Sequence, residues 1–162
     1  MTHPITRAIE LLQQTRHACM ATVNQDGSPH NTPYFFMYDA ALEHLYWGSH
    51  PESQHSKNVV RTGQIFVALY DGNQLGGLYI QAQNARITEG EEFMQALAAH
   101  NAARARVGKQ PLPRQYYDQS EQEMYAADIV KMWVNDWEVA PDGHIVRDFR
   151  AKVTAAELFQ WL

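Results

Sequence analysis

The sequence predicts a mainly antiparallel β fold with peripheral helices, closed into a small barrel. Six or seven short extended segments follow one another, and most are joined by tight turns such as Asp26-Gly27 and Asp142-Gly143. Turns of this kind connect antiparallel neighbours. Helical patterns do not follow most of these segments, as a parallel sheet of βαβ units would require. We expect a barrel because closure removes the exposed edges of short strands.

Each predicted strand has a local signal. The predicted strands cover residues 18–23, 28–38, 45–47, 65–70, 78–87, 127–137 and 144–153. Residues 65–70 are apolar on both faces, as in a strand buried between two layers. Pro29 and Pro33 each remove a backbone donor, so we expect their strand to bulge or to run along an edge. Asp71-Gly72-Asn73 predicts the turn before residues 78–87.

Helices are predicted at both ends and in one insert. Residues 5–12 show one apolar face, and Thr154 with Glu157 forms a capping box for a last helix that reaches Trp161. A second capping box, Thr88 with Glu91, opens an insert at about residues 89–125. Its later part is polar and tyrosine-rich, and it is predicted as loop or weak helix.

Composition excludes several classes of protein. The 162 residues are 45% hydrophobic and carry a net charge of −5, so we expect one globular domain over residues 1–162. No Lys/Arg cluster points to nucleic acid, and no apolar run is long enough to span a membrane. The first ten residues lack the pattern of a signal peptide, which predicts a cytoplasmic protein.

A polar loop follows the short strand 45–47. After Gly48, residues 49–58 include Ser49, Ser53, Ser56, Lys57 and Asn58 and no large apolar side chain. Ser53 or Ser56 can cap the helix that continues to residue 61. Hydroxyl groups and one ammonium beside the free N–H groups of a helix start form a phosphate site. The alternative is an ordinary capped helix on a solvated loop.

A phosphorylated aromatic cofactor would also need a flat wall and backbone groups along its ring. Trp47, Tyr34 and Phe35 are candidates for the wall, and the proline-interrupted residues 31–36 are candidates for the ring edge. The alternative makes these aromatic residues plain barrel core. A metal site at His50, Glu52 and His55 is a weaker possibility, because no known ligand spacing supports it.

Three stretches together resemble the pyridoxamine 5′-phosphate oxidase-like FMN-binding split barrels: ACMATVNQDGSPHNTPYFFMYD, LYWGSHPESQHSKNVVRTGQIFVALYD and GLYIQAQNARI. The late segment IVKMWVNDWEVAPDGHIVRDFRAKV also looks like the closing strands of that superfamily. The resemblance spans residues 18–153 outside the insert. It implies a six-stranded antiparallel split β-barrel, a homodimer, and FMN held in the groove between subunits.

Position by position, the resemblance places the flavin-contacting strand on residues 32–37 and the phosphate-binding pair on Ser56 and Lys57. Trp133 matches a tryptophan that reaches the flavin of the other subunit, and Arg147 or Arg150 matches an arginine that follows it. With the loop, the predicted cofactor-binding residues are Thr32, Pro33, Tyr34, Phe35, Tyr46, Trp47, Gly48, Ser49, Ser53, Ser56, Lys57, Asn58 and Trp133.

The departures concern phosphate and substrate binding. The oxidase has arginine where Thr32 stands, arginine where Ser56 stands, and a substrate-binding lysine where Met37 stands. Its C-terminal arginine-leucine-proline ending is also missing. We therefore expect an FMN-binding oxidoreductase that does not use pyridoxamine phosphate but works with a small-molecule substrate or electron donor. No catalytic residue is predicted. The alternative is a non-catalytic protein that binds or senses flavin, deazaflavin or haem.

Overall fold

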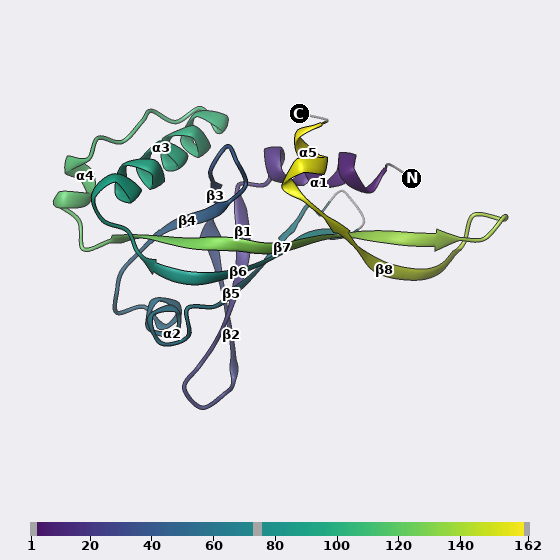
Figure 1. The fold of residues 1–162 in the computed structure, drawn as a ribbon, viewed down its shortest axis with the longest axis horizontal. Helices are drawn as coiled ribbons and strands as arrows, with labels where there is room; N and C mark the ends of the chain where they lie inside the picture. The colour runs from purple at the N-terminus through teal and green to yellow at the C-terminus, as the bar shows by residue number, and fades with distance from the viewer. Residues whose placement is uncertain (1–2, 73–75, 161–162) are drawn as a thin grey trace.

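The centre of the molecule is one antiparallel sheet of eight strands (Figure 1). The computed structural model describes residues 3–72 and 76–160, so the predictions for Asn73 and Trp161 lie outside the described residues. The elements in chain order are α1 (Pro4–Gln14), β1 (His17–Val23), β2 (Pro29–Phe35), β3 (Met37–Tyr38), β4 (His44–Ser49), α2 (Gln54–Thr62), β5 (Ile65–Tyr70), β6 (Gly77–Ile87), α3 (Gly90–Arg106), α4 (Gln115–Asp118), β7 (Glu123–Val139), β8 (Ile145–Val153) and α5 (Ala155–Phe159). The mainly antiparallel β fold with peripheral helices is confirmed.

One segment of chain makes both ends of the sheet, whose order is β2-β1-β5-β6-β7-β4-β3. β2 pairs with β1 at one end of this order, and β3 pairs with β4 at the other end. Along the chain, however, only Phe36 separates β2 from β3. The sheet therefore returns on itself as a split barrel. The resemblance implies six strands and the residue patterns predict six or seven, whereas the sheet has eight, because Phe36 divides the predicted strand 28–38 into β2 and β3. β2 is an edge strand in this chain, as Pro29 and Pro33 predicted.

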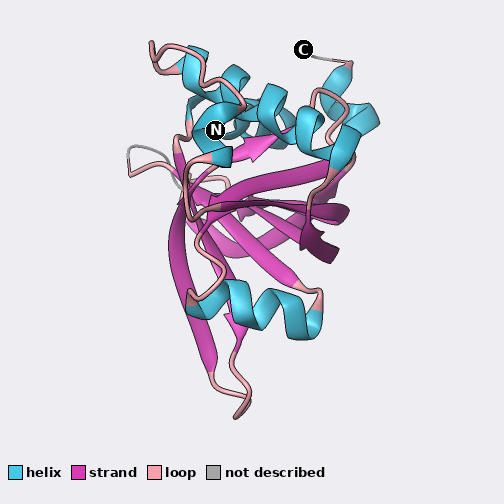
Figure 2. Ribbon diagram, turned by 90° about the vertical axis from the view of Figure 1, so that its left-hand side faces the viewer, coloured by secondary structure: helices cyan, strands magenta, loops and turns pink. Residues whose placement is uncertain are grey.

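The helices lie on two sides of the sheet. α1, α3, α4 and α5 lie on one side, and α2 lies on the other (Figures 1 and 2). Apolar side chains of the central strands, including Val67, Ile80 and Met132, are buried beneath them. Among the helices that the structure describes, none has both the length and the apolar character needed to cross a lipid bilayer.

The two predicted capping boxes have different outcomes. Thr154 and Glu157 form theirs at the start of α5, as predicted. The Thr88–Glu91 box is wrong, because α3 begins at Gly90 and Glu89 takes the N-cap position without a side-chain bond. Thr88 is buried, and its hydroxyl donates to the Met124 carbonyl at 3.0 Å. The Thr88 hydroxyl therefore bonds Met124 of β7, which is distant in sequence, instead of the start of the nearby helix.

β7 begins four residues earlier than predicted. Its first residues pair with β4, with Glu123 opposite Ser49 and Tyr125 opposite Trp47. The rings of Tyr125 and Trp47 stack with centroids 5.4 Å apart. The polar stretch before β7 contains only the short helix α4, in line with the predicted loop or weak helix. The tyrosine-rich stretch therefore contains both the short helix α4 and Tyr125, which lies in the buried first part of β7.

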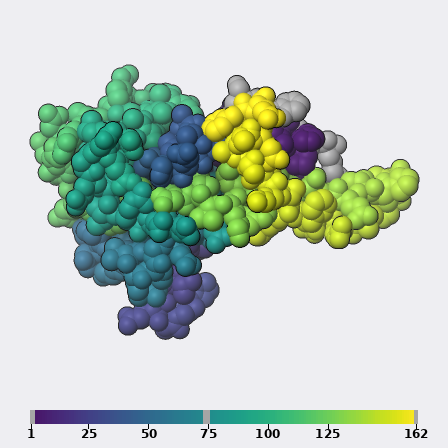
Figure 3. Space-filling model, viewed as in Figure 1, coloured from purple at the N-terminus to yellow at the C-terminus, as the bar shows by residue number. Residues whose placement is uncertain are grey.

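The β7–β8 hairpin extends away from the rest of the molecule (Figure 3). Its turn at Asp142-Gly143 is the predicted one, and Gly143 has φ +92°. Val146 and Phe149 of β8 are 57% and 40% exposed. Large apolar side chains on a projecting arm are available to contact another molecule.

Candidate functional site

The predicted phosphate loop folds into a cluster of hydroxyl groups at the start of α2. Ser53 takes the N-cap position, and its hydroxyl donates to Ser56 Oγ at 2.9 Å. Ser49 Oγ lies 2.9 Å from Ser53 Oγ and 2.7 Å from His55 Nε2. The Ser53 side chain accepts no bond from a backbone N–H of α2, so it does not cap the first N–H groups of the helix. The cluster thus gathers hydrogen-bonding groups at the positive end of a helix dipole.

His55 connects this cluster to β2. Its ring stacks on that of His30, a β2 residue, with centroids 6.5 Å apart. Burial, and secondarily the neighbouring His30, lower the pKa of His55. A neutral imidazole both donates and accepts, so His55 can bond the serine hydroxyls in either direction.

Lys57 follows Ser56 in α2 and supplies a positive charge next to the cluster in sequence. Its Nζ lies 2.9 Å from a carboxylate oxygen of Glu52, and both side chains are more than half exposed. The hydrogen bond and charge of Lys57 lower the pKa of Glu52. An exposed pair of this kind contributes little stability, so Lys57 can exchange Glu52 for another anion at small cost.

Asn58 points into the protein instead of toward the loop. Its amide nitrogen donates to Thr22 Oγ1 at 3.0 Å and to Asn24 Oδ1 at 2.9 Å. Its own Oδ1 accepts a bond from Gln54. Asn58 is 1% exposed, and it ties α2 to the β1–β2 hairpin.

The predicted flavin-contacting residues 32–37 begin in β2 and reach the first residue of β3, and β2 pairs with β1 on one side only. Thr32 and Phe35 are half-buried and Pro33 is exposed. Backbone groups on the unpaired side of an antiparallel edge strand are available to a ligand or to another chain. β2 therefore keeps the free edge that the sequence analysis expected.

The predicted aromatic wall is largely inside the barrel. Tyr34 is 7% exposed and Trp47 is 1% exposed, and their rings lie 6.5 Å apart. Burial raises the pKa of Tyr34. Tyr46 is also buried, near the ring of His44, and burial followed by the charge of Asp39 raises its pKa to about 12. Phe35 is the predicted wall residue that remains accessible in this chain.

Trp133 lies in β7, ten residues after Glu123, the residue that pairs with Ser49 of the hydroxyl cluster. It is half-buried, opposite Tyr79 and Lys152 in the sheet, and its ring lies 6.3 Å from that of Phe66. The guanidinium of Arg150 lies 3.8 Å from the centroid of the Tyr79 ring. Arg147 pairs instead with Glu138 at 3.2 Å. Of the two candidate arginines, Arg150 is the one that shares the aromatic surface of Trp133.

Sequence reasoning missed a cavity between the barrel and the α3–α4 insert. Its volume is about 330 Å³, and two predicted site residues, Phe35 and Gly48, are in its wall. The insert contributes His100 and Arg104 from α3 and Tyr117 from α4. His100 and Arg104 are spaced four apart and so share one helix face, which was the available signal. Sequence alone did not indicate which surface that face covers.

A neutral pair forms part of this wall. The Tyr117 hydroxyl lies 2.6 Å from His100 Nδ1. Burial, with the nearby charges of Arg104 and Lys109, lowers the pKa of His100 to about 4. Burial raises the pKa of Tyr117. Both groups are uncharged at neutral pH, so the positive charge of the cavity comes from Arg104 and Lys109.

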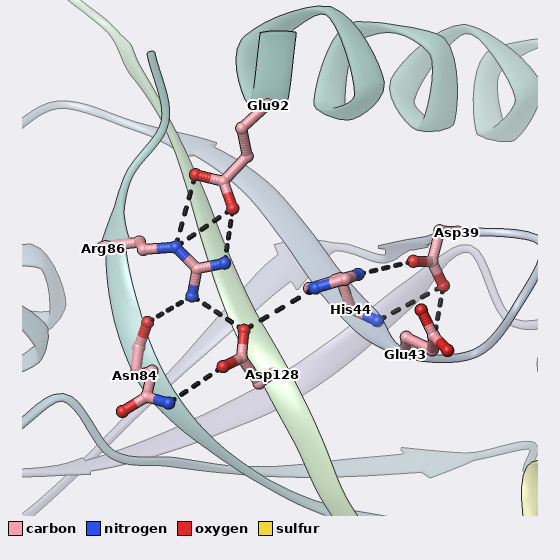
Figure 4. Close-up of polar contacts among 7 residues, drawn as sticks. All are labelled: Asp39, Glu43, His44, Asn84, Arg86, Glu92 and Asp128. Atoms are coloured by element: carbon pink, nitrogen blue, oxygen red, sulfur yellow. Dashed lines mark hydrogen bonds and ion pairs between the residues drawn. The ribbon is translucent and has the colours of Figure 1, made fainter. Parts of the chain in front are cut away.

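A second polar cluster fastens the insert to the sheet (Figure 4). Arg86 of β6 donates to Glu92 of α3 through Nε at 3.0 Å and to Asp128 of β7 through Nη1 at 2.7 Å. These two carboxylates raise the pKa of Arg86, and Glu92 has the larger effect. Burial opposes ionisation of Asp128, but hydrogen bonds from Asn84 and Arg86 outweigh it and lower the pKa of Asp128. The charged side chains of Arg86, Glu92 and Asp128 are paired with one another, so the cluster has a structural role.

No metal centre is assembled from the weak candidates in the loop. His50 lies 3.4 Å from Glu121, Glu52 pairs with Lys57, and His55 joins the serines. Asp39, Glu43 and His44 could together approach one ion, since ligand atoms of all three lie within 4.8 Å of one another. Asp39 already accepts from the backbone of both of the others and lies 2.7 Å from His44 Nδ1.

Known structures share this architecture at low identity. A heme binding protein from Mycobacterium smegmatis matches with TM-score 0.64 and 16% identity over 98% of this chain, which spans 60% of that longer protein. HutZ, a heme storage protein from Vibrio cholerae, matches with TM-score 0.64 and 16% identity over 82% of this chain and 95% of its own. An F420 reductase matches with TM-score 0.53 and 16% identity over 76% of this chain and 93% of its own.

Comparison of sequences identifies the family. No curated protein matches the chain. The family model described as pyridoxamine 5′-phosphate oxidase matches residues 6–135, which include the hydroxyl cluster, β2 and the α3–α4 insert. The chain therefore belongs to the pyridoxamine 5′-phosphate oxidase family.

Proposed function

We propose that this chain is an FMN-binding oxidoreductase whose substrate is not pyridoxamine phosphate. The observation that carries the proposal is the hydroxyl cluster of Ser49, Ser53 and Ser56 at the start of α2, with Lys57 beside it. A phosphate needs several donors and positive charge, and this place offers hydroxyl groups, helix N–H groups and one ammonium. The family membership supports the same cofactor class.

The phosphate would be held by exchange of existing bonds. The serine hydroxyls now bond one another and His55, and Lys57 now pairs with Glu52. Hydroxyl groups reorient readily, so half-buried Ser53 can turn to a phosphate oxygen, while the buried hydroxyls of Ser49 and Ser56 would orient it from behind. The exposed ion pair is weak enough for Lys57 to turn as well.

The flavin ring would lie along β2. Free backbone groups on the unpaired edge of this strand would bond the edge of the ring, while Thr32 and Phe35 flank it. Bound FMN would supply the redox chemistry, since hydride transfer belongs to the cofactor. The chain's own tasks would be to anchor the phosphate, to orient the ring and to limit the access of water.

The same edge supports a homodimer with shared sites. β2 lacks a second strand, and the β7–β8 arm carries exposed apolar side chains that can reach another subunit. Trp133 and Arg150 lie on the aromatic surface at the base of that arm and would approach the flavin of the partner. In this arrangement each subunit would complete the cofactor site of the other.

The substrate of the family oxidase is disfavoured by the residues in place. Thr32 and Met37 stand where the oxidase resemblance has arginine and lysine, and Met37 is 1% exposed. A buried thioether cannot bind a substrate phosphate. A small-molecule donor or acceptor of another kind would therefore occupy the face of the flavin.

The second candidate is a haem or deazaflavin protein on the same barrel. Proteins described as heme binding, heme storage and F420 reductase share the fold, and the neutral imidazole of His100 lies in a cavity wall. Neutral histidine is a common metal ligand. A bound haem or deazaflavin would give the purified protein a visible absorption spectrum different from that of bound FMN.

The deciding experiment is the visible spectrum of freshly purified protein, followed by mass identification of the released cofactor. We expect flavin bands and FMN. A nicotinamide donor should bleach those bands and oxygen should restore them. A Soret band would support the haem candidate, and the mass of a deazaflavin would support the other. A colourless protein that does not take up added FMN would refute the flavoprotein proposal.

A further inference from the structure

We propose that the cavity between the barrel and the α3–α4 insert is a binding site for a small aromatic carboxylate. The cavity has a volume of about 330 Å³, near the lower end of the range for ligand pockets. Its wall joins residues of β1–β4 to residues of the insert, so one side belongs to the barrel and the other to the insert. A ligand of one or two rings suits this size.

The charge of the wall selects an anion. Arg104 and Lys109 line the cavity, and no Asp or Glu does. Within the described residues, neither cation is within ion-pair distance of a carboxylate. The chain as a whole has a net charge of −5. Two cations without acidic partners in an acidic protein make this cavity a local positive site.

The position of Arg104 is set before any ligand binds. Its Nε donates to the Gln110 carbonyl at 2.6 Å, across the turn that follows α3. This bond orients the planar guanidinium, and a guanidinium binds a carboxylate with two parallel bonds. Preorganisation lowers the entropic cost of binding.

The rest of the wall suits an aromatic ring. Phe35 and His100 meet edge to face with centroids 5.6 Å apart, and His100 is 6.0 Å from Tyr117. Tyr116 adds a further ring 5.3 Å from Tyr117. Aromatic side chains in these orientations offer both faces and edges to a bound ring. An anion with a flat apolar body fits such a wall better than a hydrated inorganic ion does.

The binding proposal does not depend on the flavin, but the position of the cavity relates the two. Phe35 and Gly48 belong both to the cavity wall and to the predicted cofactor site. If the proposed function holds, the carboxylate would lie beside the flavin as substrate or as inhibitor. Binding of the carboxylate therefore tests the cavity alone. Turnover of the carboxylate by the flavin-loaded protein tests the cavity together with the proposed function.

The experiment titrates the wild-type protein with benzoate, benzamide and benzamidine, followed by ligand-observed NMR. The three probes share one ring and differ in charge, from negative to neutral to positive. We expect benzoate to bind most tightly and benzamidine not to bind. Inorganic phosphate is the fourth probe and should compete weakly. Equal binding of benzoate and benzamide, or tighter binding of phosphate, would overturn the proposal.

Variants locate the site. Arg104→Gln and Lys109→Gln should each weaken benzoate binding by about tenfold or more, because each removes a charge-assisted contact. The matched control is Arg106→Gln, on the same helix, since Arg106 lies 4.7 Å over the Tyr38 ring and does not line the cavity. Circular dichroism checks that each variant folds, and Lys109→Gln carries the test if Arg104→Gln does not fold. Equal losses in the control would overturn the assignment.

A flavin titration of the same variants separates the two proposals. FMN affinity should be unchanged in Arg104→Gln and Lys109→Gln, whether the wild-type value is high or low. A parallel loss of FMN and benzoate would place these cations in the flavin site and would refute a separate carboxylate site. Benzoate binding by a protein that takes up no FMN would leave the cavity proposal standing and remove the flavoprotein proposal.

Discussion

The Tyr117 hydroxyl and His100 Nδ1 lie 2.6 Å apart, although they come from different helices of the insert. Burial and two nearby cations hold the pKa of His100 at about 4, well below its ordinary value of 6.5. This contact joins α4 to α3 and forms part of the cavity wall. It makes the stability of the insert dependent on pH.

We expect the free energy of unfolding to fall as the pH drops from about 6.5 to about 4. In this window the unfolded chain protonates His100 and the folded chain does not, so protons favour unfolding. Below about pH 4 both states bind the proton and this contribution ends. His55, whose pKa is also lowered, acts in the same direction.

Chemical denaturation at a series of pH values measures this effect. His100→Asn should reduce the slope between pH 6.5 and 4 without abolishing it, because His55 remains. His144→Asn is the control, since that histidine is exposed in the β7–β8 turn. An unchanged slope in His100→Asn would show that His100 is not buried as a neutral group.

Lys57→Ala should raise the dissociation constant of FMN by about tenfold to a hundredfold, because one charge-assisted bond to the phosphate is lost. Riboflavin has no phosphate, so its binding should hardly change. Lys57→Arg should keep most of the affinity. Titration of both ligands by flavin fluorescence gives the comparison.

Glu52→Gln is the matched control for Lys57. It frees the ammonium from its present partner, 2.9 Å away, without removing the charge. FMN binding should therefore stay the same or become tighter. The phosphate assignment of this loop would be wrong if Lys57→Ala weakened FMN and riboflavin equally, or left FMN unaffected.

The proposed homodimer makes a prediction for Trp133. Sedimentation at micromolar concentration should show two chains per particle, with an interface of about 2,000 Å² or more, as in obligate dimers. Trp133→Ala should weaken FMN binding while the barrel keeps its thermal transition. A monomer that binds FMN tightly would contradict the shared site.

Asn58 is expected to act through the fold. Asn58→Ala removes the donor to Thr22 and Asn24 and should lower the free energy of unfolding by about 1–3 kcal/mol in urea. Gln54→Ala, which removes an exposed partner of Asn58, should cost less. If Asn58→Ala weakened FMN binding but left stability unchanged, Asn58 would be a cofactor contact instead.

Local signals in the sequence were enough for most elements. The Asp26-Gly27 turn, the two prolines of β2 and the capping box at Thr154 each depend on residues a few positions apart, and each was predicted correctly. The serines of the α2 loop are also close in sequence, so their grouping was predictable. The family was recognisable for the same reason, because order and spacing of short motifs are properties of the chain itself.

Tertiary structure decided which of these side chains face solvent and which distant ones meet. Trp47 and Tyr34 are predicted to form a cofactor wall, and in the folded chain they are only 1% and 7% exposed. Thr88 lost its predicted cap because a buried hydroxyl took the carbonyl of Met124. The cavity joins Phe35 to His100 and Tyr117 across more than sixty residues. Such contacts depend on strand pairing and helix docking between remote segments, which no local pattern encodes.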